Sequence, residues 1–220
     1  MELSEILSGL ENKIKGTFGN ESSGHDIFHL IRTCNLALNI QKSEGGDEIV
    51  IGIAALLHDV HRIIQNKTGI YCSPADSLDE IEILLCGIDI TELQKEKIKH
   101  CIEFHEEYDF TDTGKTALDI ETLILQDADN LDALGAIGIG RTFAYSGAHN
   151  VIMWQPEIPL ESDQYADDHP DPSTIHHFYS KLLKLKDNMN TQTALKLAQK
   201  RHDYMKSFLN EFFEEWKGRS

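Results

Sequence analysis

His58 and Asp59 form an adjacent pair of ionisable residues at the end of the apolar run 49–57. Because an unpaired buried charge is costly, such a pair must find a partner, and a divalent metal ion is one such partner. His29 upstream and Asp129 downstream complete a set of two imidazoles and two carboxylates. This set suits a borderline-to-hard divalent ion that keeps open positions for water and substrate.

A metal centre of this kind would support hydrolysis of a phosphoester or a phosphoanhydride. Metal-bound water deprotonates far more readily than bulk water, and the ion polarises a phosphoryl oxygen. Mn²⁺ is the favoured ion, and Mg²⁺, Ni²⁺, Co²⁺, Fe²⁺ and Zn²⁺ are compatible with the same ligands. Asp59 or Asp129 could share the proton of the attacking water. A carboxylate that binds the metal is a poor free base, so His105 is the alternative.

Four basic residues near these motifs are candidates for binding substrate phosphate: Arg32, Arg62, Lys67 and Arg141. Arg32 lies one helical turn after His29, and Arg62 offers bidentate donors. Lys67 is expected in a loop after the doublet, where most lysines are simply solvated. Arg141 either binds phosphate or pairs with Asp132 as a buried ion pair.

Three further residues could contact the ligands without binding the metal: His25, Asp26 and Asp132. His25 either supports the site from one turn before the first imidazole or faces solvent. Asp26 is also explained as the N3 residue of a helix that Ser23 caps. His61 is expected at the surface, because it points away from a helical ligand face unless the helix has already ended.

The segments that must position these residues are predicted to be helical. Helices are predicted from Ser23, over the apolar run ending near His58, from Ser73 to Gly87, from Thr91 to about His105, from about Thr116 to Leu134, from Ser173 and from Thr191. Ser73-Pro74-Ala75-Asp76 combines a cap, a first-position proline and an acid, and Thr91 with Gln94 forms a capping-box pattern. The small-residue stretch 135–140 would let helices approach closely. The fold class is therefore predicted as an all-α helical bundle.

The chain of 220 residues is long enough for one well-filled core, so a single domain over 1–220 is predicted. Residues 146–172 break the helical pattern, since they hold four of the five prolines and an acidic patch. A loop this long in a compact domain is usually functional or disordered. A lid or specificity loop is favoured over a surface excursion without a role.

The charge balance of 20 basic and 37 acidic residues argues against bulk nucleic-acid binding and against an anionic membrane surface. A small anionic substrate remains compatible, if a metal and a few basic side chains reverse the potential locally. The four cysteines show no metal-type spacing, and no secretory segment or membrane-spanning stretch is expected. Reduced thiols and a cytoplasmic location are predicted. A homo-oligomer is left open.

The ordered histidines and aspartates, with their flanks, occur in GHDIFHLIR (24–32), ALLHD (55–59) and DADNLDALG (127–135). Together with GIGRTF (138–143), HFYSKLL (177–183) and Arg201-His202, these segments resemble the HD-domain metal-dependent phosphohydrolase superfamily. The resemblance covers nearly the whole chain. It implies an all-α fold, dependence on a divalent metal and the ligands His29, His58, Asp59 and Asp129. It also favours a place for His105 in the site rather than in a core.

Within that superfamily, the chain looks most like the compact single-domain group that includes nucleotide pyrophosphohydrolases. A nucleoside triphosphate pyrophosphohydrolase is therefore the favoured function, with a 5′-nucleotidase or a cyclic-nucleotide phosphodiesterase as alternatives. Some 5′-nucleotidases place an acidic base three residues after the Asp of the doublet. Here Arg62 stands at that position and stays protonated. The alternative from another class is a nucleotide-binding sensor without turnover, which the complete ligand set argues against.

Overall fold

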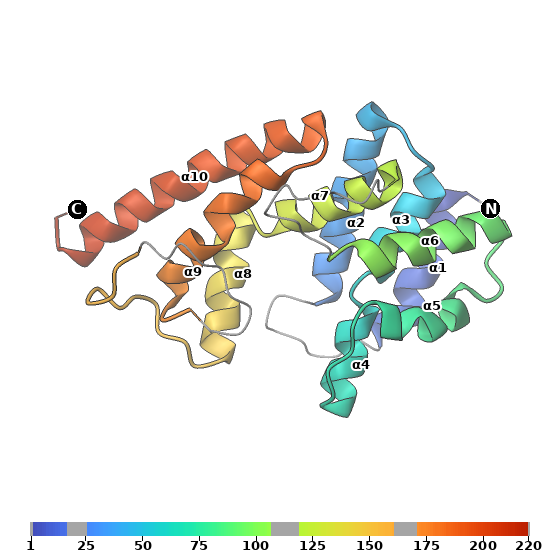
Figure 1. The fold of residues 1–220 in the computed structure, drawn as a ribbon, viewed down its shortest axis with the longest axis horizontal. Coiled ribbons are helices and arrows are strands. Elements are labelled where there is room, and N and C mark those ends of the chain that lie inside the picture. Colours follow the sequence, from blue (N-terminus) through green and yellow to red (C-terminus); the bar gives the residue numbers. More distant parts are fainter. Residues whose placement is uncertain (1, 17–25, 107–118, 161–170, 220) are drawn as a thin grey trace. The chain divides into compact units, whose positions relative to one another are not determined.

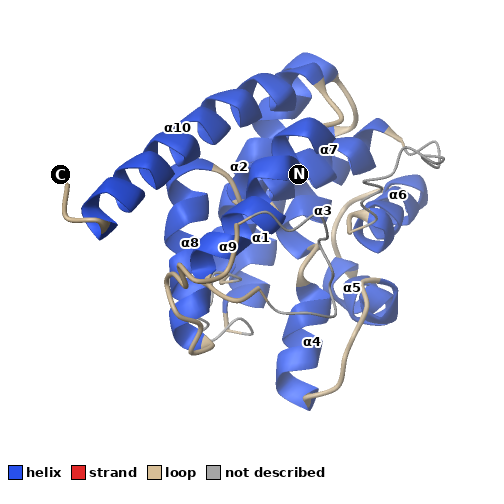
Figure 2. Cartoon of the chain, turned by 60° about the vertical axis from the view of Figure 1, so that its left-hand side comes forward, coloured by secondary structure: helices blue, strands red, loops and turns tan. Residues whose placement is uncertain are grey.

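The computed structural model describes residues 2–16, 26–106, 119–160 and 171–219, and every regular element in these ranges is a helix (Figure 1; Figure 2). The predicted all-α fold class is confirmed. Within the same ranges, no helix is both long and apolar enough to cross a membrane. The chain divides into two compact units, one running to Asp129 and the other starting at Asn130. The single domain over 1–220 stays a prediction.

Helix α3 (Glu48–Leu57) lies at the centre of the first unit. Its residues from Val50 to Leu57 are all buried. A helix that is apolar all round must be covered on all sides. Helices α1 (Leu3–Lys15), α2 (Ile27–Glu44) and α6 (Glu92–Phe104) pack against it (Figure 1). The end of α3 therefore brings the His58–Asp59 doublet into the interior of this unit.

A polar network fixes the beginning of α3. The carboxylate of Asp47 accepts hydrogen bonds from the Ile49 and Val50 amides and from the Gln94 side chain of α6. Glu121 of α7 (Ile120–Asp132) accepts from the Asp47 amide at 3.0 Å and pairs with Lys97 at 2.9 Å. Since the buried Glu121 carboxylate has these donors, its burial is tolerated. This network connects α3, α6 and α7, which lie far apart in the sequence.

Helix α2 begins later than the sequence analysis predicted. Asp26 is its N-cap, and the Asp26 Oδ1 accepts the His29 amide at 2.9 Å. The placement of Asp26 at N3 is therefore wrong, because an aspartate can cap a helix directly by accepting the amide three residues on. The predicted cap, Ser23, lies outside the described residues. The corrected boundary places His29 in the first turns of α2.

Helix α4 (Val60–Thr68) starts immediately after the doublet and ends at Gly69, whose φ of 69° is left-handed. The predicted placement of Lys67 in a loop is therefore wrong. Lys67 lies in the last turn of α4, where a cation is favoured by the helix dipole, and its side chain is exposed. Val60 and Ile63 form the buried face of this short helix.

The start signal at Thr91 is confirmed, whereas the one at Ser73 starts only a short 3-10 helix whose N-cap is Pro74. Thr91 and Gln94 form the capping box of α6. Ser73 and Asp76 exchange hydrogen bonds at the start of the short 3-10 helix η1 (Ala75–Ser77), which leads into α5 (Leu78–Leu85). Both signals depend on residues three apart, so they act without help from the rest of the fold.

The second unit contains α8 (Gly135–Ala148), α9 (Thr174–Ser180), the 3-10 helix η2 (Leu182–Asn188) and α10 (Gln192–Trp216). The buried Phe178 and the half-buried Phe143 and Phe208 form an aromatic cluster in this unit, with ring centroids 6.1 Å apart. Gly135 has a φ of 75°, and a Cβ there would lie 3.0 Å from the Arg201 side chain of α10. The small-residue stretch therefore does permit close approach, as predicted.

The proline-rich segment is held by α9 along its first part. Helix α8 runs to Ala148, so the loop begins later than residue 146. The Thr174 amide donates to the Ile152 carbonyl at 2.9 Å. Trp154 packs against His176 and Phe213, with ring centroids 5.1 Å and 5.5 Å away. Residues 161–170 lie outside the described ranges, and the role as a lid stays a prediction.

Candidate metal centre

Three parts of the first unit supply the four predicted ligands. His29 comes from the first turns of α2, and Asp129 comes from the C-terminal part of α7. His58 and Asp59 stand where α3 ends and α4 begins. Asp59 has φ −92° and ψ 15°, which interrupts the helix between the two elements. This interruption directs both side chains of the doublet to the same place.

The two imidazoles and two carboxylates alternate around a common centre. His29 Nε2 lies 3.3 Å from Asp129 Oδ1 and 3.5 Å from Asp59 Oδ2. His58 Nε2 lies 3.7 Å from Asp59 Oδ1 and 3.8 Å from Asp129 Oδ1. The ligand atoms of His29, His58 and Asp59 all lie within 4.8 Å of one another. The fold thus brings together all four residues that the sequence analysis selected.

His58 is prepared to coordinate a metal through Nε2. Its Nδ1 is 2.9 Å from the Ala55 carbonyl, so Nδ1 carries the proton in the neutral ring and Nε2 keeps its lone pair. Nε2 is buried without a hydrogen-bond partner among the described residues. Burial lowers the pKa of His58 to about 4, although Asp59 and Asp129 oppose this shift. At neutral pH the ring is therefore uncharged, as a metal ligand must be.

The carboxylate of Asp129 is ionised. Burial raises its pKa, but the hydrogen bond from His29 and the proximity of His58 hold the pKa well below the ordinary value. The buried Nε2 lone pair of His58 has no hydrogen-bond donor among the described residues and lies beside two carboxylates, which matches what a divalent cation requires. The four residues therefore fit a divalent metal ion.

His61 and His105 extend the cluster on the far side of Asp59. His61 is only 2% exposed, so the expectation that it lies at the surface is wrong. That expectation counted the helical phase of α3 through the doublet, whereas α4 starts a new helix there. His105 is fully buried, and its ring centroid lies 5.1 Å from that of His58 and 5.8 Å from that of His61. Its catalytic role stays a prediction.

Arg62 pairs with two carboxylates beside the centre. Its Nε lies 3.0 Å from Asp59 Oδ1, and its guanidinium also contacts Glu106. Burial raises the pKa of Glu106, but His61 and Arg62 outweigh it and lower the pKa to about 2. Glu106 was missed in the sequence analysis, and its only signal there is that it directly follows His105. Arg62 as a phosphate ligand stays a prediction.

The remaining predicted residues differ in their placement. Arg32 is half-buried on α2, one turn after the first ligand, and Lys67 is exposed. In the second unit, Arg141 Nη1 lies 2.9 Å from Asp132 Oδ2, so the alternative interpretation of Arg141 as a member of an ion pair is the one observed. His25 lies outside the described residues. Phosphate binding by Arg32, Lys67 and Arg141 stays a prediction.

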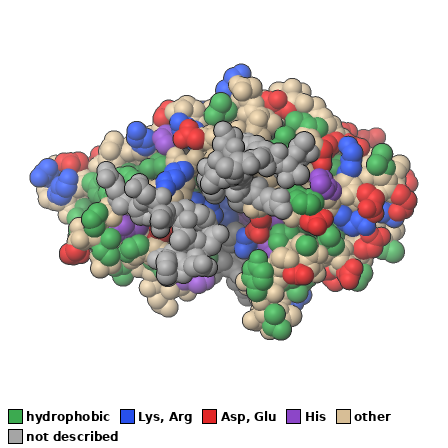
Figure 3. Space-filling model, in the orientation of Figure 1, with side chains coloured by type: hydrophobic (Ala, Val, Ile, Leu, Met, Phe, Trp, Pro, Cys, Tyr) green, Lys and Arg blue, Asp and Glu red, His purple; other side chains and the backbone are tan. Residues whose placement is uncertain are grey.

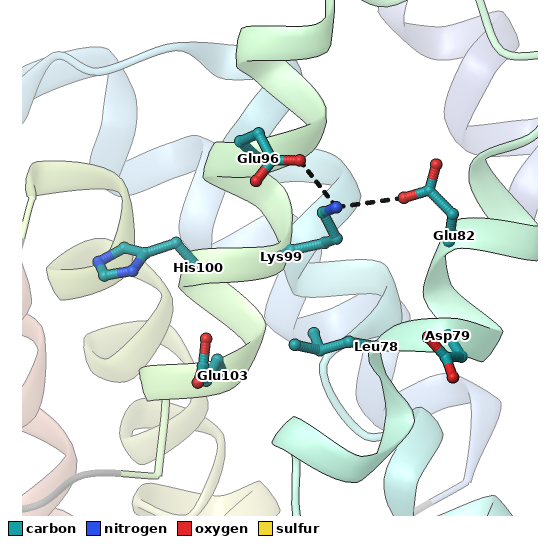
Figure 4. Close-up of a pocket in the computed structure, with 7 residues that line it drawn as sticks. All are labelled: Leu78, Asp79, Glu82, Glu96, Lys99, His100 and Glu103. Carbon is teal, nitrogen blue, oxygen red and sulfur yellow. Dashed lines mark ion pairs between the residues drawn. The ribbon is translucent and has the colours of Figure 1, made fainter.

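A surface pocket lies elsewhere on the first unit, between α5 and α6 (Figure 4). It is lined by Leu78, Asp79, Glu82, Glu96, Lys99, His100 and Glu103. Lys99, its one lysine, is already paired with Glu96 at 2.8 Å and with Glu82 at 3.3 Å. Figure 3 shows acidic and basic side chains intermixed on this part of the surface. Four carboxylates make the pocket unsuitable for a phosphate group.

An all-α protein with histidines and aspartates that alternate around one point fits the class of helical proteins that could hold a metal ion. Comparison with known proteins gives the family. The family model for the HD domain matches residues 27–134. The Bacillus subtilis protein YpgQ, described as uncharacterized, is 34% identical over 208 residues, which cover 93% of this chain and 91% of YpgQ.

Solved structures agree with this result. An HD-superfamily hydrolase from Bacillus thuringiensis has 34% sequence identity and a TM-score of 0.74, with 98% of this chain and 99% of that one covered. A crystal structure of B. subtilis YpgQ in complex with ADP has 28% identity in the structural alignment and a TM-score of 0.72, with 98% and 97% covered. The chain belongs to the HD-domain superfamily of metal-dependent phosphohydrolases.

Proposed function

We propose that this protein is a nucleoside triphosphate pyrophosphohydrolase that uses one divalent ion, with Mn²⁺ favoured, bound by His29, His58, Asp59 and Asp129. The observation that carries the proposal is the alternating arrangement, in which each imidazole Nε2 lies within 3.8 Å of both carboxylates. A nucleotide substrate is supported by the relative YpgQ, whose structure was determined in complex with ADP. A cytoplasmic location is part of the same proposal.

The bound ion would supply an acidified water and a polarised phosphoryl oxygen. The chain's own residues set the conditions for that chemistry. Asp26 fixes the His29 amide, and the Ala55 carbonyl fixes the tautomer of His58. Arg62 holds Asp59 Oδ1, so the orientation of this carboxylate does not depend on the metal alone.

His105 is the proposed proton acceptor. Its Nδ1 lies 2.6 Å from the Ile102 carbonyl, so the neutral ring keeps a lone pair on Nε2. That nitrogen is buried, beside His58, and has no hydrogen-bond partner in the described ranges. A neutral imidazole with an available lone pair at the edge of a metal site can accept a proton from water.

The test is turnover on a panel of nucleoside mono-, di-, tri- and cyclic phosphates with Mn²⁺ supplied to metal-free protein. Release of pyrophosphate from triphosphates is the expected result. Orthophosphate from monophosphates would indicate a 5′-nucleotidase, and cleavage of cyclic phosphates would indicate a phosphodiesterase. Tight nucleotide binding with no turnover of any compound would replace the proposal with the sensor.

His58→Ala and Asp129→Ala should each abolish Mn²⁺ binding and reduce turnover by at least about a hundredfold, because each removes a ligand. His149→Ala is the matched control, since His149 is exposed on the second unit. Activity that survives in both ligand variants would contradict the site assignment. Mn²⁺ binding itself can be followed by calorimetry without any substrate.

A further inference from the structure

We propose that Thr33 is a positioning residue of the metal centre, and that its hydroxyl supports the change of tautomer that His29 undergoes when an ion binds. The inference rests on the metal centre proposed above, because His29 is one of its four ligands. Thr33 is not itself a ligand and acts only through the His29 ring.

Thr33 lies one helical turn after His29, on the same face of α2. Both side chains are fully buried. Thr33 Oγ1 lies 3.4 Å from His29 Nδ1, whereas the other ring nitrogen, Nε2, is the one beside the carboxylates. The hydroxyl therefore contacts the ring at the nitrogen that leaves Nε2 available for the metal.

Helix packing alone does not explain a hydroxyl at position 33. A buried hydroxyl inside a helix usually donates to the carbonyl four residues earlier. The partner of Thr33 among the described residues is instead the imidazole of that residue. Valine has nearly the same shape as threonine and would fill the space without the cost of burying a polar group. The hydroxyl is therefore explained by the ring nitrogen that it meets.

His58 and His105 have a different kind of partner at Nδ1. His58 Nδ1 lies 2.9 Å from the Ala55 carbonyl, and His105 Nδ1 lies 2.6 Å from the Ile102 carbonyl. A carbonyl only accepts, so each of these neutral rings is fixed with its proton on Nδ1. A hydroxyl both donates and accepts, so Thr33 can pair with Nδ1 whether or not that nitrogen carries a proton.

His29 needs a partner that can do both. Its Nε2 lies 3.3 Å from Asp129 Oδ1 and 3.5 Å from Asp59 Oδ2. A carboxylate only accepts, so in the metal-free protein the neutral ring carries its proton on Nε2, and Thr33 donates to Nδ1. A bound ion needs the Nε2 lone pair, so the proton then sits on Nδ1 and Thr33 accepts it. The ring stays neutral, since the proton lost at Nε2 is replaced by one at Nδ1, and rotation of one hydroxyl accommodates the change.

The first test compares two variants of Thr33 by calorimetric titration of metal-free protein with Mn²⁺. Thr33→Val removes the hydroxyl and keeps the shape, so it should bind Mn²⁺ about tenfold or more weakly than the wild type. Thr33→Ser keeps the hydroxyl and should keep most of the affinity. Thr122→Val is the matched control, because Thr122 is also fully buried but its hydroxyl contacts Asp119 and Cys101. It should bind Mn²⁺ like the wild type.

The second test reads the tautomer directly, by NMR of the wild type with ¹⁵N-labelled histidine. Zn²⁺ replaces Mn²⁺ because it is diamagnetic, and the His29 signals are identified by their loss in His29→Gln. The His29 proton should be on Nε2 without the ion and on Nδ1 with it. His58 should carry its proton on Nδ1 in both forms. This measurement tests the inference even if Thr33→Val does not fold, which circular dichroism shows.

The outcomes separate this inference from the metal centre. Wild-type affinity in Thr33→Val, or the same protonated nitrogen of His29 with and without Zn²⁺, would overturn the inference and leave the metal centre intact. Equal losses in Thr33→Val and Thr33→Ser would also overturn it, because the hydroxyl would then make no difference. A wild type that binds no Mn²⁺ would overturn the inference and the proposed metal centre together.

Discussion

Acidification should destabilise the metal-free protein through His58. Burial lowers the pKa of this ring from 6.5 to about 4, so between these values the unfolded chain binds a proton that the folded chain excludes. The folded pKa is the depressed one. The stabilisation is therefore fully present above pH 6.5 and is lost as the pH falls towards 4.

The magnitude follows from the size of the shift. One pKa unit corresponds to about 1.4 kcal/mol, and His58 is fully buried, so screening by solvent is small. Below pH 6.5, His58 takes up one proton in the unfolded chain but not in the folded chain. Lowering the pH from 8 to 5 should therefore remove about 2 kcal/mol from the free energy of unfolding. The window stops at about pH 5 because most carboxylates titrate below it.

The assay is urea unfolding in the presence of a chelator, followed by circular dichroism at both pH values. His202 also titrates here, since burial lowers its pKa, so the wild type must be compared with His58→Gln. The wild type should lose about 2 kcal/mol more than this variant. An equal loss in both proteins would refute the reasoning, because His58 would then make no linked contribution. Mn²⁺ should stabilise the wild type and leave His58→Gln nearly unchanged.

Thr91→Ala removes the side chain that accepts the Gln94 amide in the capping box of α6, and urea unfolding should show a loss of about 1 kcal/mol. If the free energy of unfolding did not change, other contacts would hold the start of α6. Gly135→Ala should cost about 1–2 kcal/mol, because the residue has a φ of 75° and the new Cβ would meet Arg201. Its matched control is Gly140→Ala in the interior of α8, where nothing lies within 4 Å, and which should stabilise by about 1 kcal/mol. Equal effects of the two glycine variants would contradict the close approach.

Much of this fold follows from short-range patterns. The Thr91 and Ser73 signals operate between residues three apart, so they specify α6 and η1 without tertiary contacts. The apolar run before the doublet predicts a fully buried helix, and α3 is one. A predicted helix boundary is wrong where two nearby residues can both act as the N-cap. Asp26 caps α2, so the helix starts four residues after Ser23.

The sequence by itself determined which residues can form the metal centre. His29, His58, Asp59 and Asp129 have the chemistry of metal ligands, and the helices that carry them are set by local signals and apolar periodicity. Their convergence was an expectation that the packing of α2, α3 and α7 fulfilled.

Only the tertiary structure decided what surrounds that centre. The chain breaks at Asp59, which resets the helical phase and turns His61 inward. Glu106 meets Arg62 from 44 residues away, so its role has no local pattern. Side-chain partners across separate helices depend on how those helices pack, and this packing is a property of the whole first unit rather than of any segment in it.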